Sequence, residues 1–376
     1  MKPAGVYIHI PFCRSRCSYC DFATGLYETD LAARYVEAVV AEITRSAKSE
    51  QDVDTIYFGG GTPSLLTASQ VDQLLNAVAK QFNIDSSSEI TMEMNPGTVT
   101  TVGLREFRSL GINRASFGAQ TFDDAELAKL GRSHNTADTL RTFESLREAG
   151  FDNVSFDLIA GLPGQTLSRW EQNVANAIEL KPEHLSFYLL EVHSGTPLAE
   201  HIKRGIQPVP DEDLAAVMYQ SMLSKAADAG YEHYEISNLC RPGFQSHHNT
   251  KYWTGDAYFG FGCSAHSYDG MSRRWSNIRD VKQYVSTVEN HESPINQQFE
   301  LTADDKRAEA VFLGMRLMSG VDTKQYQQLF GVDLCEEYGD DIARFQEAGL
   351  VELEGDVMRL TRSGALLSNE VFAVFV

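Results

Sequence analysis

Three of the six cysteines lie within eight residues, at Cys13, Cys17 and Cys20, with the spacing C-x3-C-x2-C. A single cysteine is usually a small buried residue, but three thiols in one arginine-flanked turn gain little from burial and can converge on one metal centre. Thiolates favour zinc or iron–sulfur clusters. Structural zinc needs four ligands, for which Asp21 and His9 are poor candidates, whereas four irons on three thiolates keep one iron open. The spacing therefore favours a [4Fe–4S] cluster over zinc or a cysteine core.

The stretch that contains this loop, YIHIPFCRSRCSYCDF at residues 7–22, resembles the cluster segment of the radical S-adenosylmethionine (SAM) family. The resemblance covers most of the chain, from Gly5 to about Tyr268. It implies that the three cysteines hold a [4Fe–4S] cluster and that the amino and carboxylate groups of SAM chelate its open iron. Reductive cleavage of the sulfonium would then give a deoxyadenosyl radical.

The elements that must position this loop follow from the hydrophobic periodicity. Short apolar runs alternate with amphipathic stretches about six times, which is typical of βα units and a parallel sheet. After a first strand just before the cysteines, the expected strands are 53–58, 89–94, 114–120, 154–159 and 184–190. The expected helices are 30–48, 67–82, 101–110, 123–130, 136–149 and 168–180. Six units are too few for a closed eight-stranded barrel, and the resemblance implies an open (β/α)6 three-quarter barrel.

Polar residues gather where these strands end, and ligands of parallel α/β folds bind at the carboxyl ends of strands. Taken singly, a triple glycine is often just a tight turn and a strand-end acid is often a helix cap or a salt-bridge partner. Taken together, they match the SAM-binding positions of the oxygen-independent coproporphyrinogen III oxidase-like subgroup. By that resemblance the SAM-binding residues are Tyr7, Tyr19, Gly60, Gly61, Thr62, Glu93, Gln120, Arg132 and Asp157.

A histidine-led, aromatic stretch follows the expected barrel and the helix 211–230. For a generic sequence it would be a loop packed on the barrel rim, but histidines among aromatics also suit a haem. The segment His248–Trp253 matches the H-N-x-x-Y-W signature of haem chaperones related to the coproporphyrinogen enzymes. We expect His248 to bind haem iron, with His247, His266 and His9 as rivals.

The last part of the chain predicts helices at 303–318, 323–330 and 335–348 and strands at 350–353 and 357–360, followed by a final helix. This order resembles a winged helix, whose usual role is DNA binding. Its acidic residues argue against that role and favour packing or partner docking. We therefore expect an α/β protein of three parts: a radical SAM core at 1–195, an extension with the haem motif at 196–300 and a winged-helix-like α+β domain at 301–376.

Composition limits the possible partners. The 376 residues carry a formal net charge of −20, and the sequence pI is about 4.9, so most of the surface should repel a phosphate backbone and no nucleic acid is expected. The start of the chain has no apolar leader and no stretch approaches eighteen apolar residues, which predicts a cytoplasmic protein. Cys240, Cys263 and Cys335 are scattered, and we interpret them as ordinary buried residues.

Two functions of different class remain. One is a haem chaperone that binds haem and delivers it to an acceptor protein, such as a respiratory membrane protein, with the cluster serving assembly, homodimer formation or reductive release. The alternative is anaerobic oxidative decarboxylation of coproporphyrinogen III. Such enzymes carry a fourth cysteine where this chain has Phe22, and a long N-terminal arm that we do not expect here. With the motif at His248, these features favour the chaperone.

Overall fold

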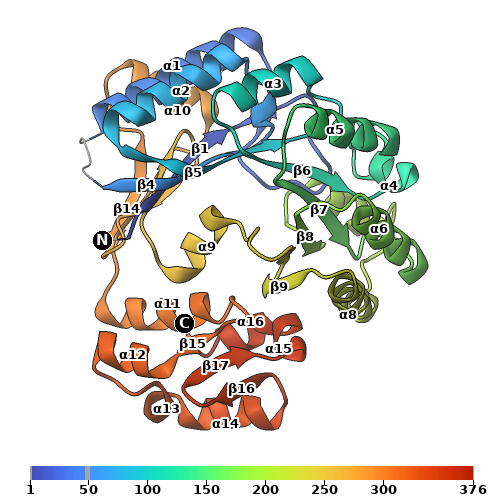
Figure 1. The fold of residues 1–376 in the computed structure, drawn as a ribbon, viewed down its shortest axis with the longest axis vertical. Coiled ribbons are helices and arrows are strands. Elements are labelled where there is room, and N and C mark those ends of the chain that lie inside the picture. Colours follow the sequence, from blue (N-terminus) through green and yellow to red (C-terminus); the bar gives the residue numbers. More distant parts are fainter. Residues whose placement is uncertain (1, 47–50, 376) are drawn as a thin grey trace.

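The computed structural model describes residues 2–46 and 51–375. One curved sheet dominates it, with most helices on the convex side and a smaller module below its open side (Figure 1). The predicted end of the first helix, Lys48, lies outside the described residues. Among the described residues, none of the helices is long and apolar enough to cross a membrane.

Six parallel strands form the centre of the sheet in the order β1-β4-β5-β6-β7-β8. Their bounds are β1 Ala4–Ile10, β4 Asp52–Gly60, β5 Asn83–Met94, β6 Arg114–Gln120, β7 Val154–Ala160 and β8 His184–Leu189. The connecting helices are α1 Thr29–Arg45, α2 Ala68–Gln81, α3 Thr101–Ser109, α4 Asp124–Lys129, α5 Thr136–Glu148 and α6 Leu167–Glu179. The predicted open barrel of six βα units is confirmed.

The helices begin where the sequence offers side-chain caps. Thr67 and Gln70 form a reciprocal capping box at the start of α2, and Asn135 and Asp138 do the same for α5. The strands are buried on both faces, as expected for a parallel sheet covered by helices. Fully buried Ile8 in β1 and Phe117 in β6 belong to the same hydrophobic core.

Further strands extend the sheet on both sides, and none of them was among the strands expected from the sequence. On one side β8 continues antiparallel to β10 Asn238–Cys240 and β9 Glu232–Glu235. On the other side β1 pairs with the parallel strand β11, and the antiparallel strands β12, β13 and β14 follow. Their bounds are β11 Tyr258–Phe261, β12 His266–Tyr268, β13 Arg273–Asn277 and β14 Ile295–Glu300. Smaller elements are β2 Phe12–Cys13, β3 Gly25–Leu26, α7 Pro197–Lys203, α8 Glu212–Asp228, α9 His247–Thr254 and α10 Val281–Glu289.

The C-terminal module has its own core, formed around Val311, Phe345 and Met358. Its small sheet has the order β15-β17-β16, with β15 Val321–Asp322, β16 Val351–Glu354 and β17 Val357–Leu360. Its helices are α11 Ala303–Gly314, α12 Thr323–Phe330, α13 Leu334–Glu337, α14 Gly339–Glu347, α15 Arg362–Leu366 and α16 Ser368–Phe372. This arrangement confirms the winged-helix-like α+β class.

Two helix predictions in this module were wrong in extent. The helix expected at 335–348 is two helices, because the backbone leaves helical geometry at Tyr338, whose φ is −120°. The Tyr338 ring instead packs edge-on against Phe375, with ring centroids 4.9 Å apart. The helix expected at 303–318 ends at Gly314. The residues after it, including Met318, bond to the backbone of residues 234–236 at the sheet edge.

Candidate functional site: a cysteine loop and a buried histidine helix

The cysteine loop follows β1 at the carboxyl end of the sheet. Cys13, Cys17 and Cys20 are unpaired and partly exposed. The Thr62 hydroxyl donates to the Cys13 Sγ at 3.7 Å. Burial raises the pKa of the Cys13 thiol to about 11. Among the described residues, no three His, Cys, Asp or Glu side chains converge as a ready metal-ligand group.

The glycine turn after β4 packs directly against this loop. A Cβ on Gly61 would lie 3.0 Å from the Cys13 Sγ and 2.7 Å from the Phe12 carbonyl oxygen, and a Cβ on Gly60 would lie 2.6 Å from the His9 ring. Gly60 also has a φ of 113°, which side chains rarely adopt. Only glycine allows this close approach of the turn to the cysteine loop.

A carboxylate lies beside the same turn. The Glu93 side chain accepts hydrogen bonds from the Tyr57 hydroxyl at 2.8 Å and from the Gly60 backbone N–H at 2.9 Å. The Glu93 side chain is half-buried, and desolvation raises the pKa of its carboxyl to about 7. The negative charge of Asp157 acts in the same direction.

Arg132 links the cysteine loop to the strand ends. Its guanidinium donates to the Cys17 Sγ at 3.4 Å, to the Asn95 Oδ1 at 2.7 Å and to the Gly118 carbonyl oxygen at 2.7 Å. Asn95 in turn donates to the Thr62 hydroxyl at 2.6 Å. Asn95 was not among the residues expected at the site, although its place directly after β5 and before a proline marks it as a strand-end residue.

The remaining predicted SAM residues lie at different depths. Gln120 ends β6 with a positive φ of 64°. Tyr19 packs against a small apolar cluster that includes Leu130. Tyr7 and Asp157 lie deeper, within β1 and β7, where the Tyr7 hydroxyl bonds the His9 Nδ1 at 3.1 Å. Thus the structure brings Cys13, Cys17, Gly60, Gly61, Thr62, Glu93 and Arg132 together, while Tyr7 and Asp157 point into the barrel below them.

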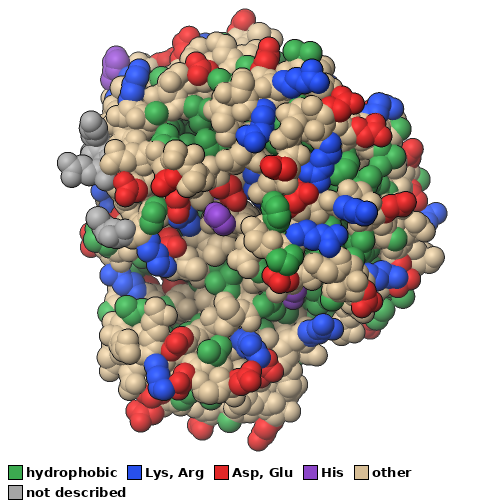
Figure 2. All heavy atoms as spheres, in the orientation of Figure 1, with side chains coloured by type: hydrophobic (Ala, Val, Ile, Leu, Met, Phe, Trp, Pro, Cys, Tyr) green, Lys and Arg blue, Asp and Glu red, His purple; other side chains and the backbone are tan. Residues whose placement is uncertain are grey.

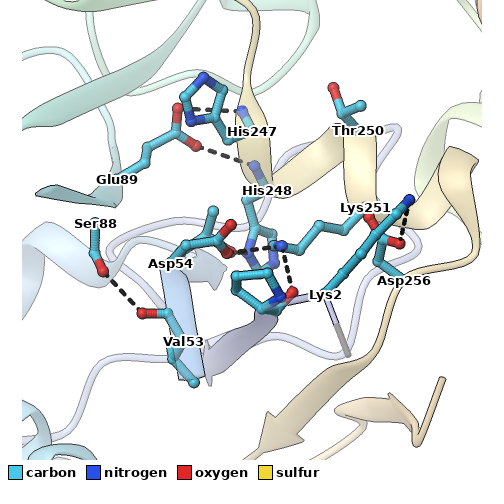
Figure 3. Close-up of polar contacts among 12 residues, drawn as sticks. Lys2, Val53, Asp54, Ser88, Glu89, His247, His248, Thr250, Lys251 and Asp256 are labelled. Carbon is cyan, nitrogen blue, oxygen red and sulfur yellow. Dashed lines mark hydrogen bonds and ion pairs between the residues drawn. The ribbon is translucent and has the colours of Figure 1, made fainter. Parts of the chain in front are cut away.

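The H-N-x-x-Y-W stretch is not a rim loop but the helix α9, which lies inside the concave side of the sheet (Figure 1). The Glu89 carboxylate of β5 accepts from the backbone N–H groups of both His247 and His248, at 3.2 and 3.1 Å (Figure 3). A carboxylate at a helix N-terminus satisfies free N–H groups and complements the helix dipole. These bonds fix α9 near the amino ends of the strands, away from the cysteines.

His248 is 1% exposed and both of its ring nitrogens are bonded. Nδ1 contacts the Thr55 hydroxyl at 2.8 Å and Nε2 contacts the Tyr252 hydroxyl at 3.0 Å. A Cβ on Gly5 would lie 3.0 Å from the His248 ring, so glycine leaves the room that the imidazole fills. Burial lowers the pKa of His248 to about 3, and it is therefore neutral. In this conformation neither nitrogen is open to a haem iron.

An ion pair between a buried lysine and a half-exposed aspartate also secures α9. The Lys251 ammonium lies 2.7 Å from the Asp54 carboxylate and donates to the Pro3 carbonyl oxygen at 2.8 Å (Figure 3). The Lys251 side chain is only 6% exposed. On the other side of the helix, the Arg316 guanidinium lies 4.2 Å from the centre of the Trp253 ring. Helix α9 therefore joins the barrel to the C-terminal module.

Of the rival histidines, His247 and His266 are exposed and His9 is buried. The Nε2 of His9 donates to the Ala23 carbonyl oxygen at 3.0 Å, so its Nδ1 is the acceptor for the Tyr7 hydroxyl.

The face drawn in Figure 2 carries acidic and basic side chains interspersed, with no broad basic patch of the kind that binds nucleic acid.

Comparisons with known proteins agree with this geometry. A model of the radical SAM superfamily matches residues 7–176, and a model of the HemN C-terminal domain matches residues 301–367. The solved structure of the Escherichia coli coproporphyrinogen III oxidase HemN covers 99% of this chain, and this chain 90% of it, with a TM-score of 0.87 at 24% identity, which shows a shared fold. The fold and the cysteine loop are those of a radical SAM protein.

Two curated relatives define the family more closely. The chain is 37% identical over its whole length to the heme chaperone HemW of Bacillus subtilis, of which 99% is covered. It is 36% identical, also over its whole length, to the heme chaperone HemW of Lactococcus lactis, of which 98% is covered. The chain belongs to the HemW family within the radical SAM superfamily.

Proposed function

We propose that this chain is a haem chaperone, which binds haem and transfers it to an acceptor protein. The observation that carries the proposal is the similarity, over the full length, to relatives named as haem chaperones. Phe22 supports it, because this residue occupies the position of the fourth cysteine expected in coproporphyrinogen oxidases and is 63% exposed.

In this proposal Cys13, Cys17 and Cys20 hold a [4Fe–4S] cluster with exchangeable SAM. Three soft sulfur donors on one partly exposed loop suit such a cluster. The glycine turn packs on Cys13, so its backbone lies beside the proposed cluster site. When bound, the cluster and SAM supply one-electron chemistry. Arg132 donates a hydrogen bond to the Cys17 sulfur and places a positive charge beside the cluster site.

The proposed SAM contacts follow from the placement of the side chains. Gly60, Gly61 and Thr62 would face the methionine amino group. Glu93 and Gln120, near the ends of β5 and β6, would accept from or donate to the hydroxyl groups of the ribose, and Arg132 would bind the carboxylate. Tyr7, Tyr19 and Asp157 complete the set, with the two tyrosines beside the sulfonium and the adenine.

For haem we propose His248 as the iron ligand, with a conformational cost. Its Nε2 must leave the Tyr252 hydroxyl at 3.0 Å before it can reach a metal. Because Glu89 and Lys251 hold the same helix, haem binding in this proposal accompanies a shift of α9 relative to β1 and β4.

Further parts of the proposal concern partners and organisation. The acceptor is a haem protein such as a respiratory membrane subunit, nucleic acid is not a partner, and the active form is a homodimer. The reducing cytoplasm suits three unpaired thiols. The chain divides into a radical SAM core at 1–195, an extension at 196–300 and a C-terminal domain at 301–376.

A second candidate, the oxygen-independent oxidation of coproporphyrinogen III, rests on one observation, the shared fold with HemN. One experiment separates the two. The protein is reconstituted anaerobically with iron and sulfide and divided between a haem titration and a turnover assay with coproporphyrinogen III, SAM and a reductant. Stoichiometric haem binding without protoporphyrinogen supports the chaperone, whereas turnover without specific haem binding overturns it.

Matched variants test the assigned residues. His248→Ala should weaken haem binding and shift the haem spectrum, while His247→Ala, at the exposed neighbour, should change neither. Unchanged affinity and spectrum in His248→Ala would remove His248 as the ligand. Cys17→Ser should abolish the cluster absorbance and the acid-labile sulfide after reconstitution, and a full cluster in that variant would contradict the three-cysteine site.

A further inference from the structure

A cavity of about 630 Å³ lies on the outer side of the sheet, away from the cysteine loop. It forms where the end of α1 and the end of α10 meet β11, β13 and the start of β14, at the upper left in Figure 1. Pockets that enclose small organic ligands usually measure about 300–1,000 Å³. The cavity is therefore large enough for a cofactor-sized molecule.

One wall of this cavity is a row of aromatic side chains: Phe82, Phe259, Phe261 and Trp275. The rings of Phe82 and Phe259 lie 5.4 Å apart, and those of Phe259 and Trp275 lie 6.2 Å apart. Phe82 and Phe261 are only 6% exposed, so the accessible ring surface comes mainly from the half-buried Phe259 of β11 and Trp275 of β13. A flat, unsaturated ligand can lie against it.

Two arginines, Arg45 and Arg273, also line the cavity. Arg45 donates to the Val288 carbonyl oxygen at 2.8 Å and contacts the His291 Nδ1 at 2.7 Å. Arg273 lies over the Trp275 ring at 5.2 Å from its centre and donates to the Gln298 side chain at 2.6 Å. Within the residues that the structure describes, neither arginine forms an ion pair with a carboxylate. Both guanidinium groups can therefore bind acidic groups of a ligand.

The two acids of the cavity differ in their availability. Glu42 accepts hydrogen bonds from the Gly262 backbone N–H, the Asn277 amide and the Tyr284 hydroxyl. Desolvation raises the pKa of this carboxyl to about 7, which reduces its negative charge at neutral pH. Glu292 is exposed at the edge, where water screens its charge. The positive charge of the two arginines thus outweighs the negative charge of the two acids, which favours an anionic ligand.

The aromatic row and the two arginines, which have no carboxylate partner among the described residues, together fit a planar, hydrophobic ligand with carboxylate arms. We propose that the cavity binds a tetrapyrrole, with the ring on the aromatic row and the carboxylates on Arg45 and Arg273. The choice of ring rests on the proposed chaperone function. Because His248 is closed in this conformation, the cavity would hold the ligand outside the barrel, with contacts to the ring and carboxylates rather than to a metal.

Strand β11 separates this cavity from the haem motif. Successive side chains of a strand face opposite sides. Tyr258 contacts Tyr252 of α9, with ring centroids 4.7 Å apart, and the next residue, Phe259, lines the cavity. A ligand in the cavity is therefore one strand away from α9, a position suited to a docking site that precedes transfer to His248.

The test is equilibrium binding of iron-free protoporphyrin IX and of haem to the full chain. The double variant R45A/R273A should bind iron-free protoporphyrin at least about tenfold more weakly, equivalent to about 1.4 kcal/mol. The R45K/R273K variant, which keeps the charges, should retain most of the affinity. Arg34→Ala is the matched control, because Arg34 lies on the same helix but pairs with Glu289 on the surface.

The outcomes separate the cavity from the chaperone function. Unchanged protoporphyrin affinity in R45A/R273A overturns the cavity site, even when haem binding depends on His248. Cavity-dependent protoporphyrin binding without haem transfer to any acceptor protein supports the cavity and overturns the chaperone function. Another outcome is that a nucleotide such as ATP binds the cavity more tightly than protoporphyrin and displaces it. That result would show that the cavity serves a different anion, and it would contradict the proposal.

Discussion

The two ends of the open barrel are built for different purposes. At the carboxyl end, three unpaired, partly exposed thiols and a raised carboxyl pKa at Glu93 leave donor groups available. At the amino end, hydrogen bonds and an ion pair with Glu89, Thr55, Tyr252 and Asp54 hold helix α9 in place. At the carboxyl end, thiols and a carboxyl group remain available for binding. At the amino end, the histidine motif is a fixed structural part of the fold.

This contrast means that similar substitutions should have different effects at the two ends. Changes in α9 should lower stability, and changes near the cysteines should alter binding with little loss of stability.

The largest effect is expected for Lys251→Met. The variant leaves the Asp54 carboxylate and the Pro3 carbonyl without their cation; breaking a fully buried pair typically costs about 3 kcal/mol or somewhat more, and because Asp54 is 39% exposed we expect a loss of about 2–3 kcal/mol. Lys225→Met is the control, because its pair with Glu171 is 3.7 Å long and exposed, and should change stability by less than about 0.5 kcal/mol. Denaturant unfolding measures both. Equal losses in the two variants would contradict the contrast.

Glu93→Gln should change the pH dependence of stability at the carboxyl end. The folded pKa of about 7 lies above the unfolded value of 4.5, so the wild type loses stability relative to the variant as pH rises. Between pH 5 and 7 the relative loss should be about 2 kcal/mol. Parallel stability curves for the two proteins would show that the Glu93 carboxyl ionises normally.

His248→Gln should change the pH dependence in the opposite direction. The folded pKa of about 3 lies below the unfolded value of 6.5, so the unfolded wild type takes up a proton first as pH falls. The wild type should therefore lose about 1.3 kcal/mol relative to the variant between pH 7 and 5.5. Urea unfolding at both pH values measures the difference, and a wild type that gains stability on acidification relative to the variant would refute it.

The smallest effect is expected for Phe22→Ser beside the cysteines. Phe22 is 63% exposed, so its removal should change the free energy of unfolding by less than about 0.5 kcal/mol. Cluster content after reconstitution should also be unchanged. A loss above about 1 kcal/mol would mean that Phe22 packs against the fold more closely than its exposure indicates.

The sequence predicted the parts of the fold that depend on local pattern. Strand β6 was expected at the residues where it occurs, and α2 within one residue at each end, because apolar periodicity and the Thr67–Gln70 capping box are local signals. The cysteine triplet and the strand-end residues were also visible, since chain order places their loops at one edge of a parallel sheet. The helical break at Tyr338 was missed, and the contact of its ring with Phe375 is a tertiary one that no local pattern reveals.

The features that sequence reasoning missed depend on long-range packing. Helix α9 is short and polar, and only the Ser246 cap, which accepts from the Asn249 backbone N–H, marks its start locally. Its burial depends on Gly5, Thr55 and Glu89, which lie far away in the chain. The outer cavity likewise combines Arg45 with Arg273, and no local pattern relates the two.

The placement of α9 also constrains how the chain folds during synthesis. Strand β1 pairs on one side with β11, so that Gly5 lies opposite Tyr258, and the intervening α9 fills the space beside Thr55 and Glu89. Before α9 and β11 have emerged from the ribosome, the nascent chain exposes one edge of β1, and the amino end of the barrel is unfilled. Pairing over such a sequence separation is slow, and exposed strand edges promote aggregation. Strand β1 is synthesised first, but it gains its second neighbour only after β11 has emerged. The barrel is complete only then.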